Sequence, residues 1–305
     1  AVAGFGYIVA TSIVAFLALR FFHGLSTGFR PTGTSAMLTD RIPKNRRGEA
    51  LGYLGVAGNA GMASGPALGS WLTVEWGIEW MFLASAVLGI VSLLFTWPLE
   101  ETLPDARAVR AADLNPFKGP LIDPQAWPAA VVLLPIALAF GVYLTITPDF
   151  VDHLGYVYKG SFNTIIVVSS ISMRFIAGRM SDRYGRIPMM LAGTILLFVG
   201  MALLGAAETK TVATIGGLVY GASIGINMPT VFAWTADLAQ PGRIALALGT
   251  MLMALEIGIG IGAVGSGMHF EGDVARLPEL YYMAAAGALL TSLALIPPLL
   301  MGKRS

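Results

Sequence analysis

The sequence predicts an all-α membrane protein. Of its 305 residues, 55% are hydrophobic and only 12% are charged, whereas a soluble domain carries about 25% charged residues. The apolar residues are grouped in stretches of about 20, which is the length that an α-helix needs to cross a bilayer. We therefore expect about nine whole membrane helices and a fragment of a tenth, at about residues 1–9, 12–38, 47–72, 79–98, 127–150, 160–179, 187–206, 211–236, 244–268 and 279–301.

The composition also excludes several classes of function. A net charge of +1 gives no reason to expect a nucleic acid partner. The absence of cysteine excludes disulfides, thiolate metal sites and cysteine nucleophiles. No phosphate-binding glycine–lysine loop and no HExxH motif occurs, and the three histidines are scattered. We therefore expect no cofactor, no metal and no enzymatic activity.

The basic residues and one polar segment organise the helices. Thirteen Lys and Arg fall in one set of alternate loops and at the C-terminus, against three in the opposite set. Because loops rich in Lys and Arg stay in the cytoplasm, we expect the first set and the C-terminus to be cytoplasmic. The long polar segment 99–126 is then a cytoplasmic linker between an N-terminal bundle at 1–98 and a C-terminal six-helix bundle at 127–305.

An internal repeat relates the two halves. A shift of 197 residues without a gap gives the identities Gly24/Gly221, Gly28/Gly225, Asp40/Asp237, Arg46/Arg243, Gly52/Gly249, Gly61/Gly258 and Gly65/Gly262. Parallel repeats of this kind mark transporter halves that are related by an axis along the membrane normal. Since the second half begins near Trp127, the first would begin about 70 residues before Ala1. We therefore expect the N-terminal bundle to be incomplete, without its first two helices and most of its third.

Small residues recur at fixed places in the stretch at 52–70. Gly52, Gly61, Gly65, Pro66 and Gly69 follow the pattern G-x8-G-x3-GP-x2-G in an uncharged apolar segment. Small residues let membrane helices approach closely, and neighbouring helices compensate for the backbone bond that proline removes. The pattern predicts a helix that is tightly packed on one side.

A loop with paired charges lies between the expected helices at 160–179 and 187–206. It contains Gly178, Asp182, Arg183, Gly185 and Arg186 in the pattern G-x3-D-R-x-G-R. The glycines allow a tight turn, and the aspartate accepts hydrogen bonds from arginine. We interpret the loop as a latch that closes the cytoplasmic side. The alternative is a basic loop that only fixes the topology. At the neighbouring cytoplasmic helix ends, we expect Asp40 and Asp237 to be structural partners of loop arginines.

Two polar residues interrupt apolar spans at equivalent places in the repeat. Glu256 lies near the middle of the 244–268 span, and its repeat mate is Asn59. Because intramembrane ionisable groups are costly and usually functional, we interpret Glu256 as a proton or substrate site and place Asn59 in the same cavity. The alternative for Glu256 is a protonated side chain that joins two helices.

Further polar residues follow one side of the 12–38 helix. Arg20, His23, Thr27 and Arg30 have helical spacing and form a polar stripe, which we expect to line a wet path. Arg20 would otherwise bind backbone carbonyls, and His23 would be a structural hydrogen-bonding group.

Two more residues are candidates for the cavity or the proton path. Asn227 is the repeat mate of Arg30, and Asp149 follows Pro148 at the outer end of the 127–150 helix. For Asp149 an ordinary solvated outer loop is an equal alternative.

These motifs resemble a known family. The loop at 178–186 is similar to the second-half signature loop of the major facilitator superfamily, and the pattern at 52–69 resembles the fifth-helix motif of its proton-coupled efflux pumps. Arg20-Phe21-Phe22-His23-Gly24 resembles the R-x-x-Q-G motif of its fourth helix, with His in place of Gln. The match covers essentially the whole chain, as helices three to twelve.

The resemblance implies a function as well as a fold. It implies two six-helix bundles, alternating access, export driven by proton entry, and a role for Arg20 in proton coupling. We therefore expect a monomeric multi-pass protein of the bacterial cytoplasmic membrane that exports small organic compounds, with protons and the lipid bilayer as partners. An importer or uniporter of sugars or metabolites, and a membrane sensor or scaffold that lost transport, are the alternatives.

Overall fold

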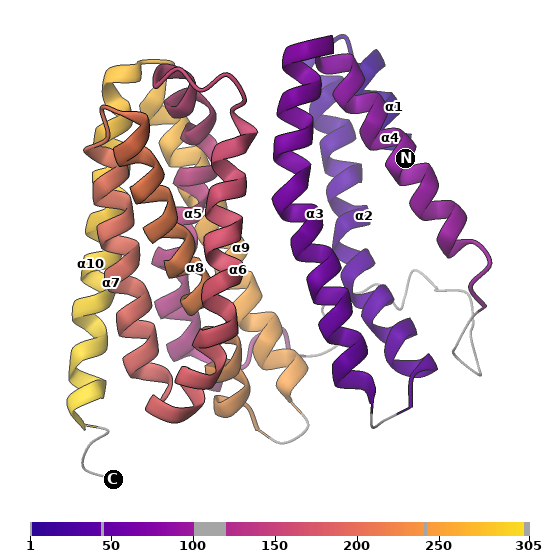
Figure 1. Ribbon diagram of the computed structural model, residues 1–305. Helices are drawn as coiled ribbons and strands as arrows, with labels where there is room; N and C mark the ends of the chain where they lie inside the picture. The colour runs from indigo at the N-terminus through magenta and orange to yellow at the C-terminus, as the bar shows by residue number, and fades with distance from the viewer. Residues whose placement is uncertain (1, 44–45, 101–119, 241–242, 302–305) are drawn as a thin grey trace. The chain divides into compact units, whose positions relative to one another are not determined.

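The computed structural model describes residues 2–43, 46–100, 120–240 and 243–301, apart from the side chains of 27–32, 35–36, 39, 47–49, 51–52 and 298–301. The described residues form α-helices with two short 3₁₀ helices (Figure 1). The elements are α1 (Val2–Val9), α2 (Ile13–Arg41), α3 (Arg47–Trp76), α4 (Ile78–Thr96), η4 (Pro124–Ala126), α5 (Trp127–His153), α6 (Gly160–Tyr184), α7 (Arg186–Gly205), α8 (Lys210–Leu238), α9 (Ile244–Phe270), η5 (Val274–Arg276) and α10 (Leu277–Met301).

Within the described part of the chain, the nine whole helices and the fragment are confirmed, but several helices are longer than predicted. The largest difference is α6, which continues to Tyr184 instead of ending near residue 179. An apolar stretch marks only the part of a helix inside the hydrocarbon core. Backbone hydrogen bonding continues beyond it until a residue such as Gly185, with φ 93°, ends the helix.

The chain divides into two compact units, each described here by itself. Unit 1 comprises Ala1–Leu114 with α1–α4, and unit 2 comprises Asn115–Ser305 with α5–α10. The boundary falls within the segment expected to be a linker, whose residues 101–119 lie outside the described residues. The last residues of that segment belong to unit 2, where Asp123 and Ala126 are buried.

Unit 2 is built from four long helix contacts. In Figure 1 its helices run side by side, with α5 packed along α9, α8 against both α6 and α7, and α10 against α7. Large side chains fill the space between them, and Tyr220, Tyr281, Phe162 and Met201 are almost completely buried.

Glycines bring the backbones of unit 2 into direct contact. A Cβ atom placed on Gly258 or Gly262 of α9 would lie 2.6 Å from the carbonyl oxygen of Leu134 or 2.2 Å from that of Leu138, both on α5. Such distances are far below ordinary contact. The α9 glycines therefore form a close-packed seam of the kind that small residues allow in membrane helices.

A second seam joins α8 to α6. A Cβ atom on Gly221 or Gly225 would meet the carbonyl oxygens of Ile166 and Ser170 at 2.3 and 2.4 Å. Gly221, Gly225, Gly258 and Gly262 all belong to the internal repeat, so four of its five second-half glycines make these contacts, whereas Gly249 has nothing within 4 Å of an added Cβ atom.

Unit 1 uses other contacts. Gly4 of α1 lies against Ala86 of α4, where an added Cβ atom would come within 2.8 Å of the alanine side chain. The hydroxyl of Tyr7 is 3.0 Å from Nδ1 of His23, which links α1 to α2. The repeated glycines Gly24, Gly61 and Gly65 have open space where a side chain would be.

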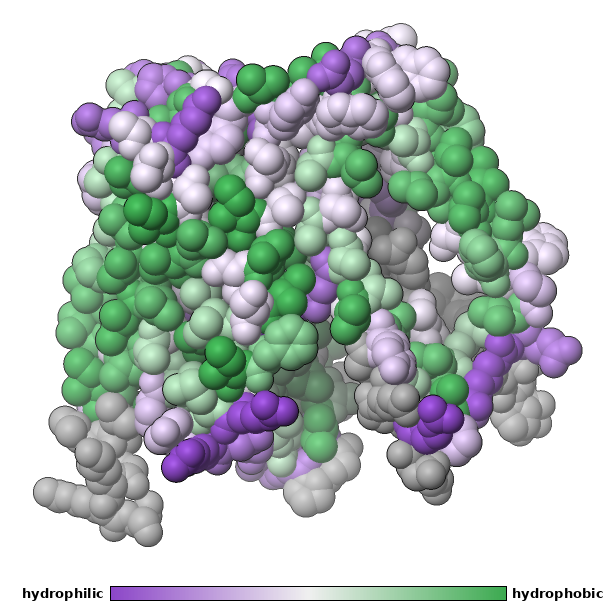
Figure 2. Space-filling view, in the orientation of Figure 1, coloured by the Kyte–Doolittle hydropathy of each residue, from purple (hydrophilic) through white to green (hydrophobic). Residues whose placement is uncertain are grey.

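The helices match the requirements of a bilayer. Among the described residues, α4 to α10 are seven helices long and apolar enough to cross a membrane. In Figure 2 apolar residues cover the middle of the visible face of unit 2, and hydrophilic residues lie at its two ends. This distribution is that of a multi-pass membrane protein.

Candidate transport site

The cytoplasmic loop of unit 2 is held by one arginine. Nη1 of Arg186 is 2.6 Å from Oδ1 of Asp182 and donates to the hydroxyl of Ser181 at 2.9 Å. Nε of the same side chain is 2.7 Å from Oδ2 of Asp237 at the end of α8. Arg186 therefore ties α6, α7 and α8 together at this end of unit 2, and the predicted pairing of Asp237 with a loop arginine is confirmed.

The two glycines of the loop differ in role, and only Gly185 forms the predicted turn. Gly185 joins α6 to α7 with φ 93° and ψ 162°, a backbone conformation that is essentially limited to glycine. Gly178, by contrast, lies inside α6, where nothing comes within 4 Å of an added Cβ atom. The prediction that Gly178 forms part of the turn is wrong, because α6 continues past it.

The two glycines should therefore respond oppositely to alanine. We expect Gly185→Ala to lower the free energy of unfolding by about 1–3 kcal/mol, because alanine is strained at this φ. Gly178→Ala should be neutral or stabilise by up to about 1 kcal/mol, because alanine favours a helix. Thermal unfolding of the purified variants in detergent measures both. Equal effects would contradict the assignment of the turn to Gly185.

Arg183, the remaining charged residue of the loop, stands apart from this network. Its guanidinium carbon lies 5.5 Å from the centre of the Tyr184 ring, and it forms no ion pair with a described residue. Only Asp182 and Arg186 of the predicted loop charges are brought together.

Glu256 lies in the middle of α9 on the side away from α5. The residues of α9 that pack on α5 include Ala254 and Gly258, whereas Glu256 is exposed on the opposite side of the helix. It forms no hydrogen bond or ion pair with any described residue. Its repeat mate Asn59 is half-buried in α3 and likewise has no such partner.

The predicted polar stripe of α2 is described only in part. Arg20 is exposed in unit 1, seven residues from the start of α2, and His23 is occupied by its contact with Tyr7. The side chains of Thr27 and Arg30 lie outside the described residues. The role of the stripe in transport stays a prediction.

Two further candidates have contrasting surroundings. Asn227 is completely buried, and its Nδ2 donates to the hydroxyl of Ser223 at 3.3 Å. Its Oδ1 fills the space beside Gly193 of α7, 2.1 Å from where a Cβ atom would be. Asn227 thus occupies a helix contact inside unit 2. Asp149 is exposed near the end of α5, as an outer-loop residue would be.

The packing motif at 52–69 is open within its own unit. Gly61 and Gly65 have no neighbour within 4 Å of an added Cβ atom, and Gly69 has only the side chain of Met81 at 3.5 Å. Pro66 lies inside α3, and the surroundings of Gly52 lie outside the described residues. Unit 1 does not make the expected close contact, so the role of this first copy stays a prediction.

Arg174 is a polar membrane residue that the sequence interpretation missed. It lies in α6, ten residues before Tyr184, and is exposed in unit 2. A signal was present, because Arg174 is the single charge in the otherwise uncharged stretch at 163–178. On the same side of α6, Asn163 accepts a hydrogen bond from the hydroxyl of Tyr143 on α5.

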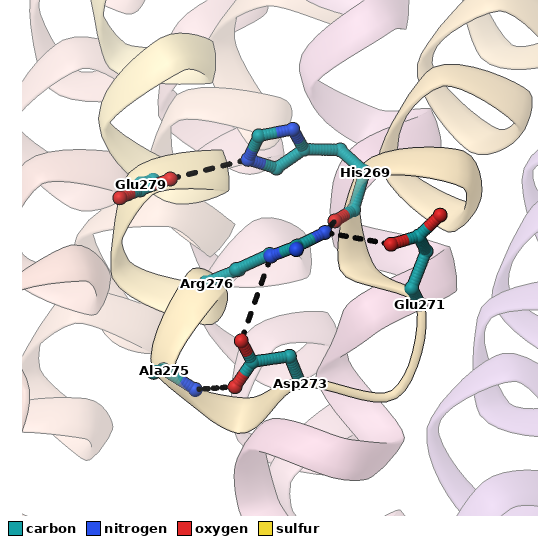
Figure 3. Close-up of polar contacts among 6 residues, drawn as sticks. All are labelled: His269, Glu271, Asp273, Ala275, Arg276 and Glu279. Carbon is teal, nitrogen blue, oxygen red and sulfur yellow. Dashed lines mark hydrogen bonds and ion pairs between the residues drawn. The ribbon is translucent and has the colours of Figure 1, made fainter.

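A group of charged residues joins α9 to α10 at the end of unit 2 remote from Arg186. Figure 3 shows Arg276 between Glu271 and Asp273, and His269 beside Glu279. Nη1 of Arg276 is 3.0 Å from Oε2 of Glu271, and its Nε is 3.5 Å from Oδ2 of Asp273. Nε2 of His269 is 3.1 Å from Oε2 of Glu279. These charged groups pair with one another at the connection between the end of α9 and the start of α10. Among the described residues, no cluster of His, Asp and Glu could hold a metal ion.

Together, these features define a class. Two units related by an internal repeat, apolar helices with close-packed glycine seams, and charged side chains within the spans are the features of a polytopic secondary transporter. The sequence model of the Major Facilitator Superfamily matches residues 1–263. The chain belongs to the Major Facilitator Superfamily and is a membrane transporter.

Relatives agree with this assignment. The chain is 23% identical over 92% of its length to MJ1560, an MFS-type transporter of Methanocaldococcus jannaschii, and 31% identical over 51% of its length to multidrug resistance protein 1 of Bacillus subtilis. It is 24% identical over 61% of its length to the glycine betaine/proline/ectoine/pipecolic acid transporter OusA of Dickeya dadantii. These matches span 73%, 40% and 42% of the respective relatives.

Solved structures share the fold. The D-xylose–proton symporter superimposes with a TM-score of 0.72 over 96% of this chain and 76% of that chain, at 15% sequence identity. The likeness extends over α1 to α10 and concerns the fold alone.

Proposed function

We propose that this protein exports small organic compounds by alternating access, in exchange for protons. The observation that carries the proposal is the position of Glu256, a carboxylate in the middle of a membrane helix that has no partner among the described residues and lies outside the α5–α9 packing face. The name of the B. subtilis relative, a multidrug resistance protein, supports export of organic compounds.

The physical argument concerns the cost of the charge. An ionised carboxylate at the centre of a span costs several kcal/mol unless it is paired or faces water, so such groups are rare outside functional sites. A carboxylate that serves helix packing would be hydrogen-bonded to a neighbouring helix, and Glu256 is not bonded to a described one. Glu256 can therefore exchange a proton for a substrate group as the transporter changes state, with Arg20 as a second charge in the proton path.

The Arg186 network supplies the second part of the mechanism. Because Arg186 holds α6, α7 and α8 at one end of unit 2, these helix ends move as one body. We assign this end to the cytoplasmic side, from the excess of Lys and Arg there. The network then stabilises the state in which the cytoplasmic side is closed.

The test is Glu256→Gln in proteoliposomes with an imposed pH gradient. The probes are benzoate, benzamide and benzylammonium, which are an anion, a neutral compound and a cation of similar size. We expect the wild-type protein to accumulate at least one probe in an acidic lumen, and the variant to lose this accumulation while retaining exchange at equal pH. Glu208→Gln, in the exposed connection before α8, is the matched control.

The outcomes separate the alternatives. Unchanged gradient-driven accumulation by Glu256→Gln would remove Glu256 from the proton path. Accumulation in an alkaline lumen would show symport instead. Symport is the second candidate, because the named substrates of OusA are osmolytes. No flux of any probe would contradict the proposed substrate class.

A further inference from the structure

Unit 2 contains a second charged side chain within a helix long and apolar enough to cross a membrane. Arg174 precedes the end of α6 at Tyr184 by ten residues, which is roughly 15 Å along the helix. Glu256 follows the start of α9 at Ile244 by twelve residues, or roughly 18 Å. The two opposite charges therefore lie at similar depths from the same side of the membrane.

Arg174 has no counter-charge among the described residues. Its side chain is exposed in unit 2 and forms no hydrogen bond or ion pair with a described residue. A guanidinium stays charged under all physiological conditions. At this depth it must face water or a bound anion, because contact with lipid is strongly unfavourable.

The side of α6 that carries Arg174 is polar. Asn163, Ser170 and Arg174 are seven and four residues apart and so share one side of the helix. The hydroxyl of Tyr143, on α5, donates a hydrogen bond to Oδ1 of Asn163. Ser170 is buried. The side thus changes from buried at Ser170 to open at Arg174.

The surface of α6 next to Arg174 has open space at Gly178. Gly178 lies one turn beyond Arg174 on the same side of α6, and nothing comes within 4 Å of a Cβ atom placed there. The surface of α6 one turn beyond Arg174 is therefore open.

We propose that Arg174 binds the carboxylate of an organic anion that the protein transports. This assignment rests on the proposed transport function and names its substrate class. A guanidinium can donate two parallel hydrogen bonds to a carboxylate, which gives both affinity and orientation. The Tyr143–Asn163 pair lies on the same side of α6, eleven residues or roughly 16 Å before Arg174.

The test measures binding separately from flux. Isothermal titration of the purified protein with benzoate, benzamide and benzylammonium should show preferred binding of benzoate. Arg174→Gln should weaken benzoate binding about 10- to 100-fold, as expected for a lost charge-assisted bond. Arg174→Lys should recover part of the affinity, because it keeps the charge without the paired donors.

Arg179→Gln, five residues further along α6, is the matched control and should leave benzoate binding unchanged. Equal weakening of all three probes by Arg174→Gln would show that Arg174 acts structurally and would overturn the proposal, as would preferred binding of benzylammonium. Gradient-driven flux of benzamide or benzylammonium without benzoate binding would reject this inference and leave the transport function intact. Benzoate binding that depends on Arg174, without any flux, would uphold the site and reject the transport mechanism.

Discussion

One added methyl group at Gly262 should separate α9 from α5. A Cβ atom at this position lies 2.2 Å from the carbonyl oxygen of Leu138 and 3.0 Å from its carbonyl carbon. Both atoms belong to the α5 backbone, so a rotamer change cannot relieve the overlap, and the helices must move apart. We expect Gly262→Ala to cost about 1–3 kcal/mol, as other overpacked contacts do.

The same helix provides a control with the same chemical change. Gly265 of α9 has nothing within 4 Å of an added Cβ atom, so Gly265→Ala should leave the unfolding temperature unchanged or raise it slightly. Thermal unfolding in detergent, followed by intrinsic fluorescence, compares the two variants. If both alanines had the same effect, the α5–α9 seam would not be a close backbone contact.

Removal of the Arg186 charge should impair transport far more than stability. The carboxylates of Asp182 and Asp237 are largely exposed, at 71% and 54% of their side-chain areas, and exposed ion pairs contribute only about 0–1 kcal/mol each to stability. The two pairs together amount to about 1 kcal/mol, and this energy applied to the balance between two transport states changes their populations by roughly fivefold. We therefore expect Arg186→Gln to slow transport about fivefold with little change in unfolding temperature.

Arg183→Gln is the matched control in the same loop. Arg183 contacts only the Tyr184 ring among the described partners, so its removal should leave the transport rate near that of the wild-type protein. The measurement is the initial rate of probe uptake into proteoliposomes at equal protein content. Equal loss of rate in both variants would indicate that the loop acts through its total charge, which is the topology-only interpretation.

The helices were predictable because the bilayer imposes their length. A span needs about 20 apolar residues whatever its neighbours are, so the positions of α1 to α10 follow from local composition. The ends were less predictable. The last turn of α6, which contains Asp182, is polar, and only the backbone conformation of Gly185 ends it.

Residues of the candidate site were predictable only where a charged residue interrupts an apolar stretch. Glu256 is a charge in an apolar run, and the same rule applies to Arg174, which was overlooked among the loop arginines of the same helix. The structure distinguished Arg174 from these loop arginines by its position in α6, ten residues before the end of the helix at Tyr184. Asn227 is likewise a polar residue in an apolar helix, but the structure places its side chain in the contact of α8 with Gly193 of α7. The sequence could not show this, because the surroundings of a side chain depend on the neighbouring helix.

The sequence by itself determined the membrane class, the order of the helices and the repeat, since these depend on composition and spacing along the chain. It could not determine which glycines are packed. Gly61 and Gly65 have the same spacing as Gly258 and Gly262, yet only the second pair meets another backbone within its unit. The tertiary structure decided this, because close packing requires a partner helix. For α9 that partner is α5.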